Sequence, residues 1–210
     1  MNATFVCLLT AVVSYLLGSL NFAIIISKLF LKKDIRNFGS GNAGSTNSLR
    51  VMGAGKTVFV ILGDIIKAVV AVNLTRLFVA NFTSVDVELA VSVSAAACIL
   101  GHTYPVFFGF KGGKGVLTTA AVMACIDIRI FLIAITVFIV IVALTKYVSL
   151  GSIIAVWILP VLFALFYGFN PETMEYLILL VLVACFVTVL HRSNISRLLA
   201  GTENKLKFKK

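Results

Sequence analysis

Long apolar segments separated by short polar joints alternate along most of the chain. Seven such segments are present, at about residues 4–29, 57–80, 89–108, 117–126, 130–145, 148–168 and 176–191. Most of them approach the roughly 20 residues that a helix needs to cross the hydrocarbon core of a bilayer, although 117–126 is short. Because irregular backbone is unstable against lipid, each segment is expected to be a helix. The pattern predicts an all-α integral membrane protein with about seven transmembrane helices.

The composition agrees with a chain that has lipid as its solvent. Of the 210 residues, 60% are hydrophobic and 12% are charged, whereas a soluble domain is nearer half apolar and a quarter charged. No linker, low-complexity stretch or internal repeat marks a second domain. Residues 1–210 are therefore expected to form a single polytopic membrane domain.

The positive charges fall in alternate joints. Basic residues gather in four places, at 30–56, at 109–116, at Lys146 and in the tail after residue 191. The joints at 81–88 and 169–175 contain no lysine or arginine, and 127–129 contains one. Because lysine and arginine collect on the cytoplasmic side, this alternation predicts an external N-terminus and a cytoplasmic C-terminus. It also accounts for the net charge of +10, so no nucleic-acid partner is expected.

Three polar segments, 36–50, 101–118 and 191–203, are unlike ordinary connectors. By the predicted topology all three lie on the cytoplasmic side, where they can form one site. The first places six hydroxyl, amide or guanidinium side chains among three glycines: Ser40, Asn42, Ser45, Thr46, Asn47 and Arg50 among Gly39, Gly41 and Gly44. The second contains Lys111 and Lys114 among Gly112, Gly113 and Gly115. Glycine-rich backbone and cationic side chains both favour a phosphate ligand, as does a helix beginning after residue 115.

Nucleotide-binding motifs are excluded by their context. The spacing Gly39-x-Gly41-x-x-Gly44 matches the dinucleotide fingerprint, but its flanks are apolar helices rather than a βαβ unit. The segment 109–115 lacks one residue of a Walker loop, and Gly115 replaces the hydroxyl residue that would hold magnesium. We therefore expect no nucleotide ligand.

Two other enzyme classes and a metal site also lack their residues. Neither histidine is followed by the His-x-x-x-x-Asp pair of CoA-dependent glycerolipid acyltransferases, and the multi-aspartate pattern of metal-dependent phosphatidyl transferases is missing. The four cysteines sit inside apolar runs without metal-binding spacing. No metal and no cofactor are expected.

Several polar residues lie in or beside the apolar segments. Asp64 and Lys67 stand three apart on one helix face, where an ion pair is expected. His102 is expected to shape the start of the second polar segment. His191 and Asn194 share a face at the end of the last apolar segment, where His191 is a candidate to orient or deprotonate a hydroxyl. Ser149 stands at a predicted cytoplasmic helix end.

Taken together, the three polar segments resemble motifs of the PlsY family, the acyl-phosphate-dependent glycerol-3-phosphate acyltransferases of bacteria. The family motif G-S-G-N-x-G-[AS]-T-N-x-x-R matches Gly39 to Arg50, and H-R-x-N-I-x-R-L-x-x-G-T-E matches His191 to Glu203. The motif G-H-x-x-P-x-F-x-x-F-K-G-G-K-G-V-A-T matches Gly101 to Thr118 apart from Leu117. Asn21 stands where proline is common in the family, and Leu190 where a basic residue often precedes the histidine.

The resemblance implies a seven-helix enzyme of the bacterial cytoplasmic (inner) membrane with its active site on the cytoplasmic face. It implies transfer of a fatty acyl group from acyl phosphate to the 1-hydroxyl of sn-glycerol 3-phosphate. The products would be lysophosphatidic acid and inorganic phosphate, in phospholipid synthesis. Neither acyl-CoA nor acyl carrier protein is implied as the direct donor.

The resemblance also implies roles by matching position. Ser40, Arg50 and Lys111 would hold phosphate or stabilise the developing oxyanion, while His191 and Asn194 would position glycerol 3-phosphate. Glu203 would be structural. The remaining expected contacts to phosphate or substrate are Gly39, Gly41, Asn42, Gly44, Thr46, Asn47, Gly112, Gly113, Lys114, Gly115 and Ser149.

One alternative of another class is a transporter of an organic phosphate, because cationic glycine-rich breaks between spans also serve transport. Transporter sites lie near the bilayer midplane and often come in repeated halves. Here the polar residues gather at one predicted membrane face and no repeat is evident, which favours the enzyme.

Overall fold

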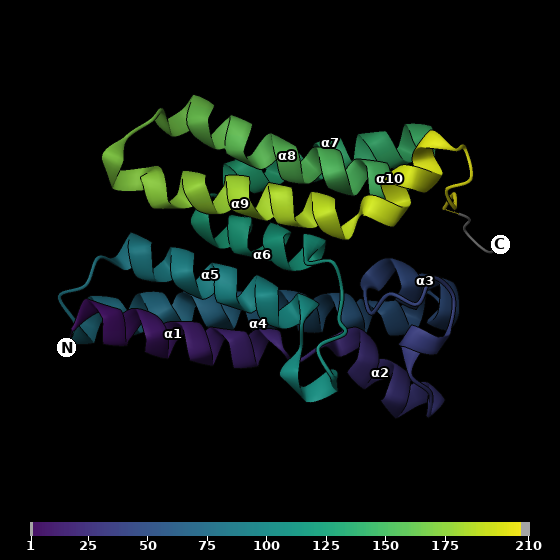
Figure 1. The fold of residues 1–210 in the computed structure, drawn as a ribbon, viewed down its shortest axis with the longest axis horizontal. Helices are drawn as coiled ribbons and strands as arrows, with labels where there is room; N and C mark the ends of the chain where they lie inside the picture. The colour runs from purple at the N-terminus through teal and green to yellow at the C-terminus, as the bar shows by residue number, and fades with distance from the viewer. Residues whose placement is uncertain (1, 207–210) are drawn as a thin grey trace. The chain divides into compact units, whose positions relative to one another are not determined.

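The computed structural model describes residues 2–206, and over that range the regular structure is entirely helical (Figure 1). The α-helices are α1 (Ala3–Gly18), α2 (Phe22–Leu31), α3 (Ser45–Met52), α4 (Ala54–Phe82), α5 (Val87–Thr103), α6 (Val116–Ile126), α7 (Ile128–Thr145), α8 (Val148–Tyr167), α9 (Met174–Leu190) and α10 (Arg192–Leu199). The chain divides into two compact units, Met1–Cys125 and Ile126–Lys210. The all-helical prediction is confirmed.

Within the described residues, six helical segments are long and apolar enough to cross a membrane. They are Ala3–Leu31, Ala54–Phe82, Val87–Phe108, Ile128–Thr145, Val148–Tyr167 and Pro171–Leu190. The predicted helix at 117–126 is present as α6, but its 11 residues fall short of that length. Along α4, Leu62, Ile66, Val70 and Leu74 recur every fourth residue, and each has 43–57% of its surface exposed. Such a stripe suits contact with lipid tails.

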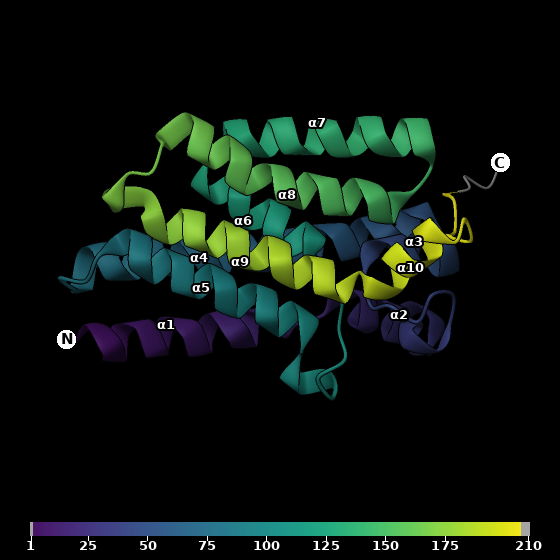
Figure 2. The same cartoon turned by 45° about the horizontal axis from the view of Figure 1, so that its top comes forward.

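In the first unit, α1, α4 and α5 pack side by side (Figures 1 and 2). Glycines let α1 and α5 approach closely, because a Cβ at Gly18 would overlap the Cys98 carbonyl and one at Gly101 would overlap the Tyr15 carbonyl. Between the same helices the Ser14 and Ser94 hydroxyls are 2.6 Å apart and hydrogen-bonded. Small residues and interhelical hydrogen bonds are the usual means of holding helices together in lipid.

The first apolar segment is not one continuous helix. It was expected to span residues 4–29 without interruption, but α1 ends at Gly18 and α2 begins at Phe22. Asn21 caps α2, its side-chain oxygen accepting a hydrogen bond from the Ile24 N–H at 3.1 Å. An amide side chain at this position accepts a hydrogen bond from a backbone N–H that the first turn of a helix leaves without a partner. The pattern of apolar residues does not reveal such a cap. Helices α2 and α3 both pack on α4.

In the second unit, α7, α8 and α9 follow one another as antiparallel neighbours, and α10 continues from α9 (Figure 2). Asp127 caps α7 by accepting a hydrogen bond from the Arg129 N–H at 2.8 Å. Its carboxylate also accepts one from the Tyr167 hydroxyl of α8 at 2.6 Å. A hydrogen bond from the Arg129 guanidinium, with help from Tyr167, holds the pKa of the Asp127 carboxyl far below its usual range. These contacts tie the start of α7 to the end of α8.

Candidate active site

The first polar segment is a compact loop organised by Asn47. The Asn47 side chain is 1% exposed; its oxygen accepts from the Ser40 N–H at 2.8 Å, and its amide donates to the Phe38 carbonyl at 2.9 Å. Gly39 has a φ of +61°, and a Cβ there would overlap the Asn47 side-chain oxygen. The structure thus gives Asn47 a defined part in shaping the loop, while its contact with phosphate stays a prediction.

The second polar segment folds back on the end of α5. The Gly112 N–H donates to the Thr103 carbonyl at 2.9 Å, and the Gly113 N–H donates to the His102 carbonyl at 3.1 Å. Both glycine N–H groups were expected to be open phosphate donors, and instead the protein backbone already satisfies them. Direct phosphate contact by these two groups is therefore a prediction that requires the loop to rearrange.

Helix α6 begins directly after this loop, as expected. Gly115, with a φ of +78°, makes the turn into the helix, and its carbonyl accepts from the Thr119 N–H at 2.8 Å. The positive φ is costly for any other residue, which explains a glycine where a Walker loop has serine or threonine. The partial positive charge of the α6 N-terminus favours an anion near Lys114 and Gly115.

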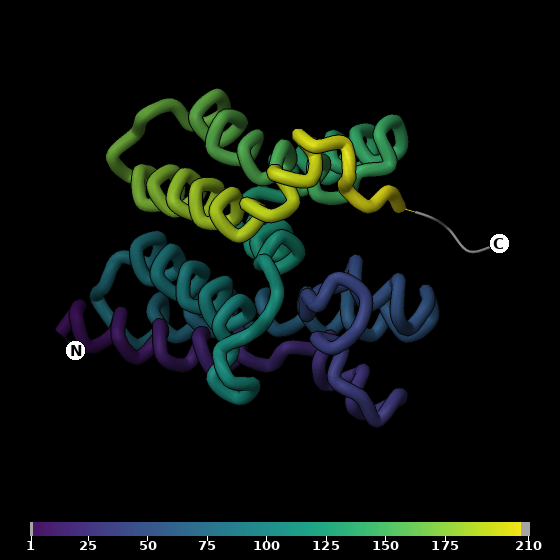
Figure 3. Tube along the Cα trace, turned by 45° about the vertical axis from the view of Figure 1, so that its right-hand side comes forward, coloured from purple at the N-terminus to yellow at the C-terminus, as the bar shows by residue number. Residues whose placement is uncertain are grey.

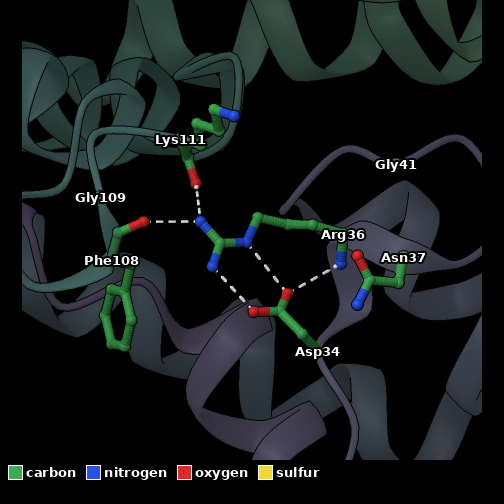
Figure 4. Close-up of a pocket in the computed structure, with 8 residues that line it drawn as sticks. Asp34, Arg36, Asn37, Gly41, Phe108, Gly109 and Lys111 are labelled. Carbon is green, nitrogen blue, oxygen red and sulfur yellow. Dashed lines mark hydrogen bonds and ion pairs between the residues drawn. The ribbon is translucent and has the colours of Figure 1, made fainter.

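Arg36 holds the two loops together (Figure 4). One guanidinium nitrogen donates to the Phe108 carbonyl at 2.6 Å and to the Lys111 carbonyl at 3.0 Å. The other side of the guanidinium pairs with both Asp34 carboxyl oxygens, at 3.0 and 2.8 Å. These hydrogen bonds from Arg36 lower the pKa of the Asp34 carboxyl below its usual value. Most donors of Arg36 are engaged, so it acts as a tether between the loops rather than as a phosphate ligand.

A cavity of about 530 Å³ opens beside this tether. Its lining residues come from both loops: Asp34, Arg36, Asn37, Gly41, Phe108, Gly109, Lys111 and Gly112. In Figure 4 the Lys111 side chain extends away from the Arg36–Asp34 pair. The Phe108 ring centroid also lies 5.7 Å from the Lys28 ammonium of α2. The backbone trace in Figure 3 shows the chain turning back after α5 before it runs into α6.

Two predicted phosphate ligands present cationic side chains to solvent. Arg50, on the last turn of α3, and Lys111 are both exposed. Among residues 2–206 neither side chain forms an ion pair. Ser40 is likewise exposed, whereas Asn42 and Thr46 are half-buried. The first unit brings the loops of segments 36–50 and 101–118 together through Arg36. Of the predicted ligands, Gly41, Lys111 and Gly112 line one cavity between these loops.

The predicted residues of the second unit form a hydrogen-bonded cluster around Glu203. The Glu203 carboxylate accepts from the Ser149 hydroxyl at 3.0 Å, from the Asn194 amide at 2.8 Å and from the Arg197 guanidinium at 2.7 Å. Burial acts to raise the pKa of Glu203, but these three hydrogen bonds outweigh it, so the pKa lies below its ordinary value. The cluster joins the start of α8 to α10 and to the segment that follows it.

His191 lies at the junction of α9 and α10 and is 4% exposed. Its Nδ1 is 2.8 Å from the Val187 carbonyl oxygen. Because a carbonyl only accepts, Nδ1 carries the proton, and in the neutral ring Nε2 is then an acceptor. This tautomer suits a residue that orients or deprotonates a hydroxyl.

Replacing Glu203 with glutamine is expected to destabilise the protein by about 2 kcal/mol at pH 7, because a charged hydrogen bond to Arg197 is lost. The depressed folded-state pKa means that the carboxylate stabilises fully above its ordinary value of 4.5. That contribution is lost as pH falls through the folded-state pKa, so the gap between variant and wild type narrows in acid. Thermal unfolding in detergent at pH 7, 4 and 3 measures this. The exposed Glu172→Gln is the control, and an equal midpoint for Glu203→Gln and wild type at pH 7 contradicts the prediction.

Sequence reasoning missed the tether made by Asp34 and Arg36. Its signal was an acid two residues before an arginine, in a joint that is otherwise basic. The Arg36 charge was assigned to membrane orientation, and the carbonyls that it binds are 72 and 75 residues away in sequence. The ion pair between Asp64 and Lys67, in contrast, is confirmed at 2.7 Å.

The helices and loops define a multi-pass, helical integral membrane protein that carries a glycine-rich, cationic loop cluster. The family model for glycerol-3-phosphate acyltransferase matches residues 8–201 of the chain. The chain belongs to this family, in its PlsY branch, and is an acyltransferase by family.

Individual relatives and structures agree. The chain is 43% identical to a glycerol-3-phosphate acyltransferase of Shouchella clausii, over 94% of each chain. It is 44% identical to the one of Halalkalibacterium halodurans, again over 94% of each. A crystal structure of PlsY (YgiH), an integral membrane glycerol 3-phosphate acyltransferase in its glycerol 3-phosphate form, superposes with a TM-score of 0.84 at 35% identity over 96% of each chain. The lysophosphatidic acid form superposes with a TM-score of 0.82 at 33% identity, over 96% of this chain and 95% of the other.

Proposed function

We propose that this protein transfers a fatty acyl group from acyl phosphate to the 1-hydroxyl of sn-glycerol 3-phosphate. The products are lysophosphatidic acid and inorganic phosphate. The observation that carries the proposal is the Arg36 tether, because it joins the loop of Ser40, which leads into α3 and Arg50, to the loop of Lys111. The glycerol 3-phosphate and lysophosphatidic acid forms of the related PlsY support the acceptor and the product.

The chemistry needs charge placement more than a reactive side chain. The glycerol oxygen attacks the acyl carbonyl carbon and forms the ester bond, while the bond from that carbon to the phosphate oxygen breaks. Inorganic phosphate leaves with the bonding electrons, and the hydroxyl proton passes to a base. Arg50 and Lys111 offset the phosphate and oxyanion charge in this step. Because acyl phosphate is already activated, no covalent enzyme intermediate is required.

His191 and Asn194 are proposed to position glycerol 3-phosphate. The Nε2 acceptor of His191 is suited to hold the acceptor hydroxyl, and either this nitrogen or a substrate phosphate oxygen takes its proton. Asn194 and Ser149 are fixed by Glu203. Thr46 and the glycines of both loops supply further contacts to phosphate, and those of Gly112 and Gly113 require the second loop to rearrange.

We further propose that the chain works as one polytopic domain in the bacterial inner membrane, with seven crossings and its site on the cytoplasmic face. The alternation of basic and non-basic joints supports an external N-terminus and a cytoplasmic C-terminus. The short α6 is then the fourth crossing. The acyl tail of the donor lies among the helices while the loops hold the phosphates.

The test is an assay with the purified protein in detergent. Acyl phosphate and glycerol 3-phosphate are supplied, and lysophosphatidate and inorganic phosphate are measured. Both products are expected in equal amounts, and phosphate release without glycerol 3-phosphate is the control for simple hydrolysis. Acyl-CoA is expected not to replace acyl phosphate. Absence of lysophosphatidate with acyl phosphate, or efficient use of acyl-CoA, contradicts the proposal.

A further inference from the structure

A buried ionic cluster lies beneath the second loop and is not used by the proposed chemistry. Lys67 of α4 is 3% exposed, Asp64 is 1% exposed, and His102 at the end of α5 is 3% exposed. The Lys67 ammonium is 2.7 Å from the Asp64 carboxylate, 3.0 Å from His102 Nδ1 and 2.9 Å from the Leu20 carbonyl. The cluster therefore touches the break between α1 and α2 as well as the end of α5.

The three contacts of Lys67 fix the tautomer of His102. An ammonium has three protons and no acceptor, and here it has three acceptors around it. His102 Nδ1 lies closer to the Lys67 ammonium than to the Asp64 carboxylate, at 3.0 against 3.5 Å. With Lys67 as the ammonium ion that pairs with Asp64, Lys67 can only donate, so Nδ1 accepts from it and the neutral ring carries its proton on Nε2.

The opposite edge of the His102 ring faces the glycine loop. A Cβ on Gly113 would overlap His102 Nε2, so only glycine allows the loop to lie against the ring. The His102 carbonyl accepts from the Gly113 N–H at 3.1 Å. Asn21, in the break between α1 and α2, donates to the same carbonyl at 3.5 Å and to the Ala43 carbonyl of the first loop at 3.2 Å. One histidine thus connects a buried ion pair to the backbone between Lys111 and Lys114.

We propose that His102 is a positioning residue for the second loop, and that Asp64 and Lys67 hold its ring so that Lys111 and Lys114 meet a phosphate. The ligand class is the phosphate group of glycerol 3-phosphate, so the proposal rests on the proposed function. A buried ion pair carries a desolvation cost. In this protein the pair holds the His102 ring, which lies against the second loop.

The test compares wild type with His102→Asn. The asparagine side-chain oxygen still offers Lys67 an acceptor, but the side chain has no ring edge to lie against Gly113. The KM for glycerol 3-phosphate is expected to rise about tenfold, with kcat changed less than threefold. Hydrogen exchange of the peptide covering residues 105–116 is expected to be faster, because the Gly112 and Gly113 N–H bonds loosen. A second variant, Asp64→Leu with Lys67→Met, removes both charges together and is expected to raise the same KM and the same exchange.

Ser92→Ala is the matched control, because Ser92 is a buried polar residue of α5 whose hydroxyl has no partner among residues 2–206. It is expected to match wild type in both measurements. An unchanged KM in His102→Asn overturns the proposal, as does a raised KM with unchanged exchange, since that means direct contact rather than positioning. An unchanged KM in the double variant contradicts the proposal that Asp64 and Lys67 hold the His102 ring in place. If wild type itself lacks acyl transfer, the proposed function fails, whereas the exchange measurement still tests the loop.

Discussion

Arg50→Ala is expected to lower kcat/KM for acyl transfer by about 100- to 1000-fold, the range found when one preorganised donor to a developing oxyanion is removed. Arg50 sits on the last turn of α3, exposed and without an ion pair among residues 2–206. Its guanidinium is therefore available to an incoming phosphate, unlike that of Arg36, which Asp34 and two carbonyls engage. Initial rates at varied concentrations of each substrate measure the loss.

Two further variants separate charge from geometry. Arg50→Lys keeps the positive charge but not the planar fork, so it is expected to recover only part of the activity. Lys56→Ala removes another cation near the first loop, one that lies over the Phe30 ring at 6.0 Å and is outside the proposed site. It is expected to stay within twofold of wild type. Equal activity of Arg50→Ala and wild type contradicts the role of Arg50, and an equal loss in Lys56→Ala points to overall charge instead.

Gly112→Ala is expected to lower kcat/KM by more than about 100-fold, because misplacing catalytic groups by an ångström is enough for such a loss. A Cβ at this position would overlap the carbonyl oxygens of His102 and Thr103. Both are backbone atoms and cannot swing aside as a flexible side chain does, so the loop that carries Lys111 must move. Steady-state kinetics and the thermal unfolding midpoint are measured together.

Gly55→Ala is the matched glycine control. Gly55 lies in the first turn of α4, where a Cβ has open space around it. Alanine there is expected to leave activity unchanged and to raise the unfolding midpoint slightly, because it reduces the freedom of the unfolded chain. Wild-type kinetics in Gly112→Ala would show that the loop tolerates displacement, contrary to the prediction.

The break between α1 and α2 illustrates where sequence patterns end. Residues 4–29 are mostly apolar, and no polar stretch among them is long enough to indicate a helix end. The sequence therefore predicted one helix. Asn21 was noted only as a departure from the family pattern. In the structure its side chain caps α2 and also donates to the Ala43 carbonyl of the first loop, 22 residues away. A helix cap can be predicted from the sequence around Asn21. The second acceptor of its side chain, the Ala43 carbonyl, cannot be predicted because it lies in a separate loop.

The glycines of the second loop give a similar lesson. Their spacing with Lys111 and Lys114 indicated an anion site, and α6 begins after Gly115 as expected. Which N–H groups remain open was not predictable, because the Gly112 and Gly113 bonds depend on how the end of α5 is placed. The acceptors are backbone carbonyls, which every residue has, so no side-chain identity marks them.

The sequence by itself determined that this is a helical membrane protein, and it placed the glycines and cations in the loops for which phosphate chemistry is predicted. The lengths of the apolar segments and the positions of the charges predict helices because exposing backbone or charge to lipid is costly. The motifs in the three polar segments identify the family. Only the tertiary structure decided that Arg36 is a tether, that Glu203 gathers Ser149 and Asn194, and that Lys67 fixes His102. These roles depend on which donors meet which acceptors across long sequence separations, and hydrogen bonds of that kind are set by packing rather than by neighbours in the chain.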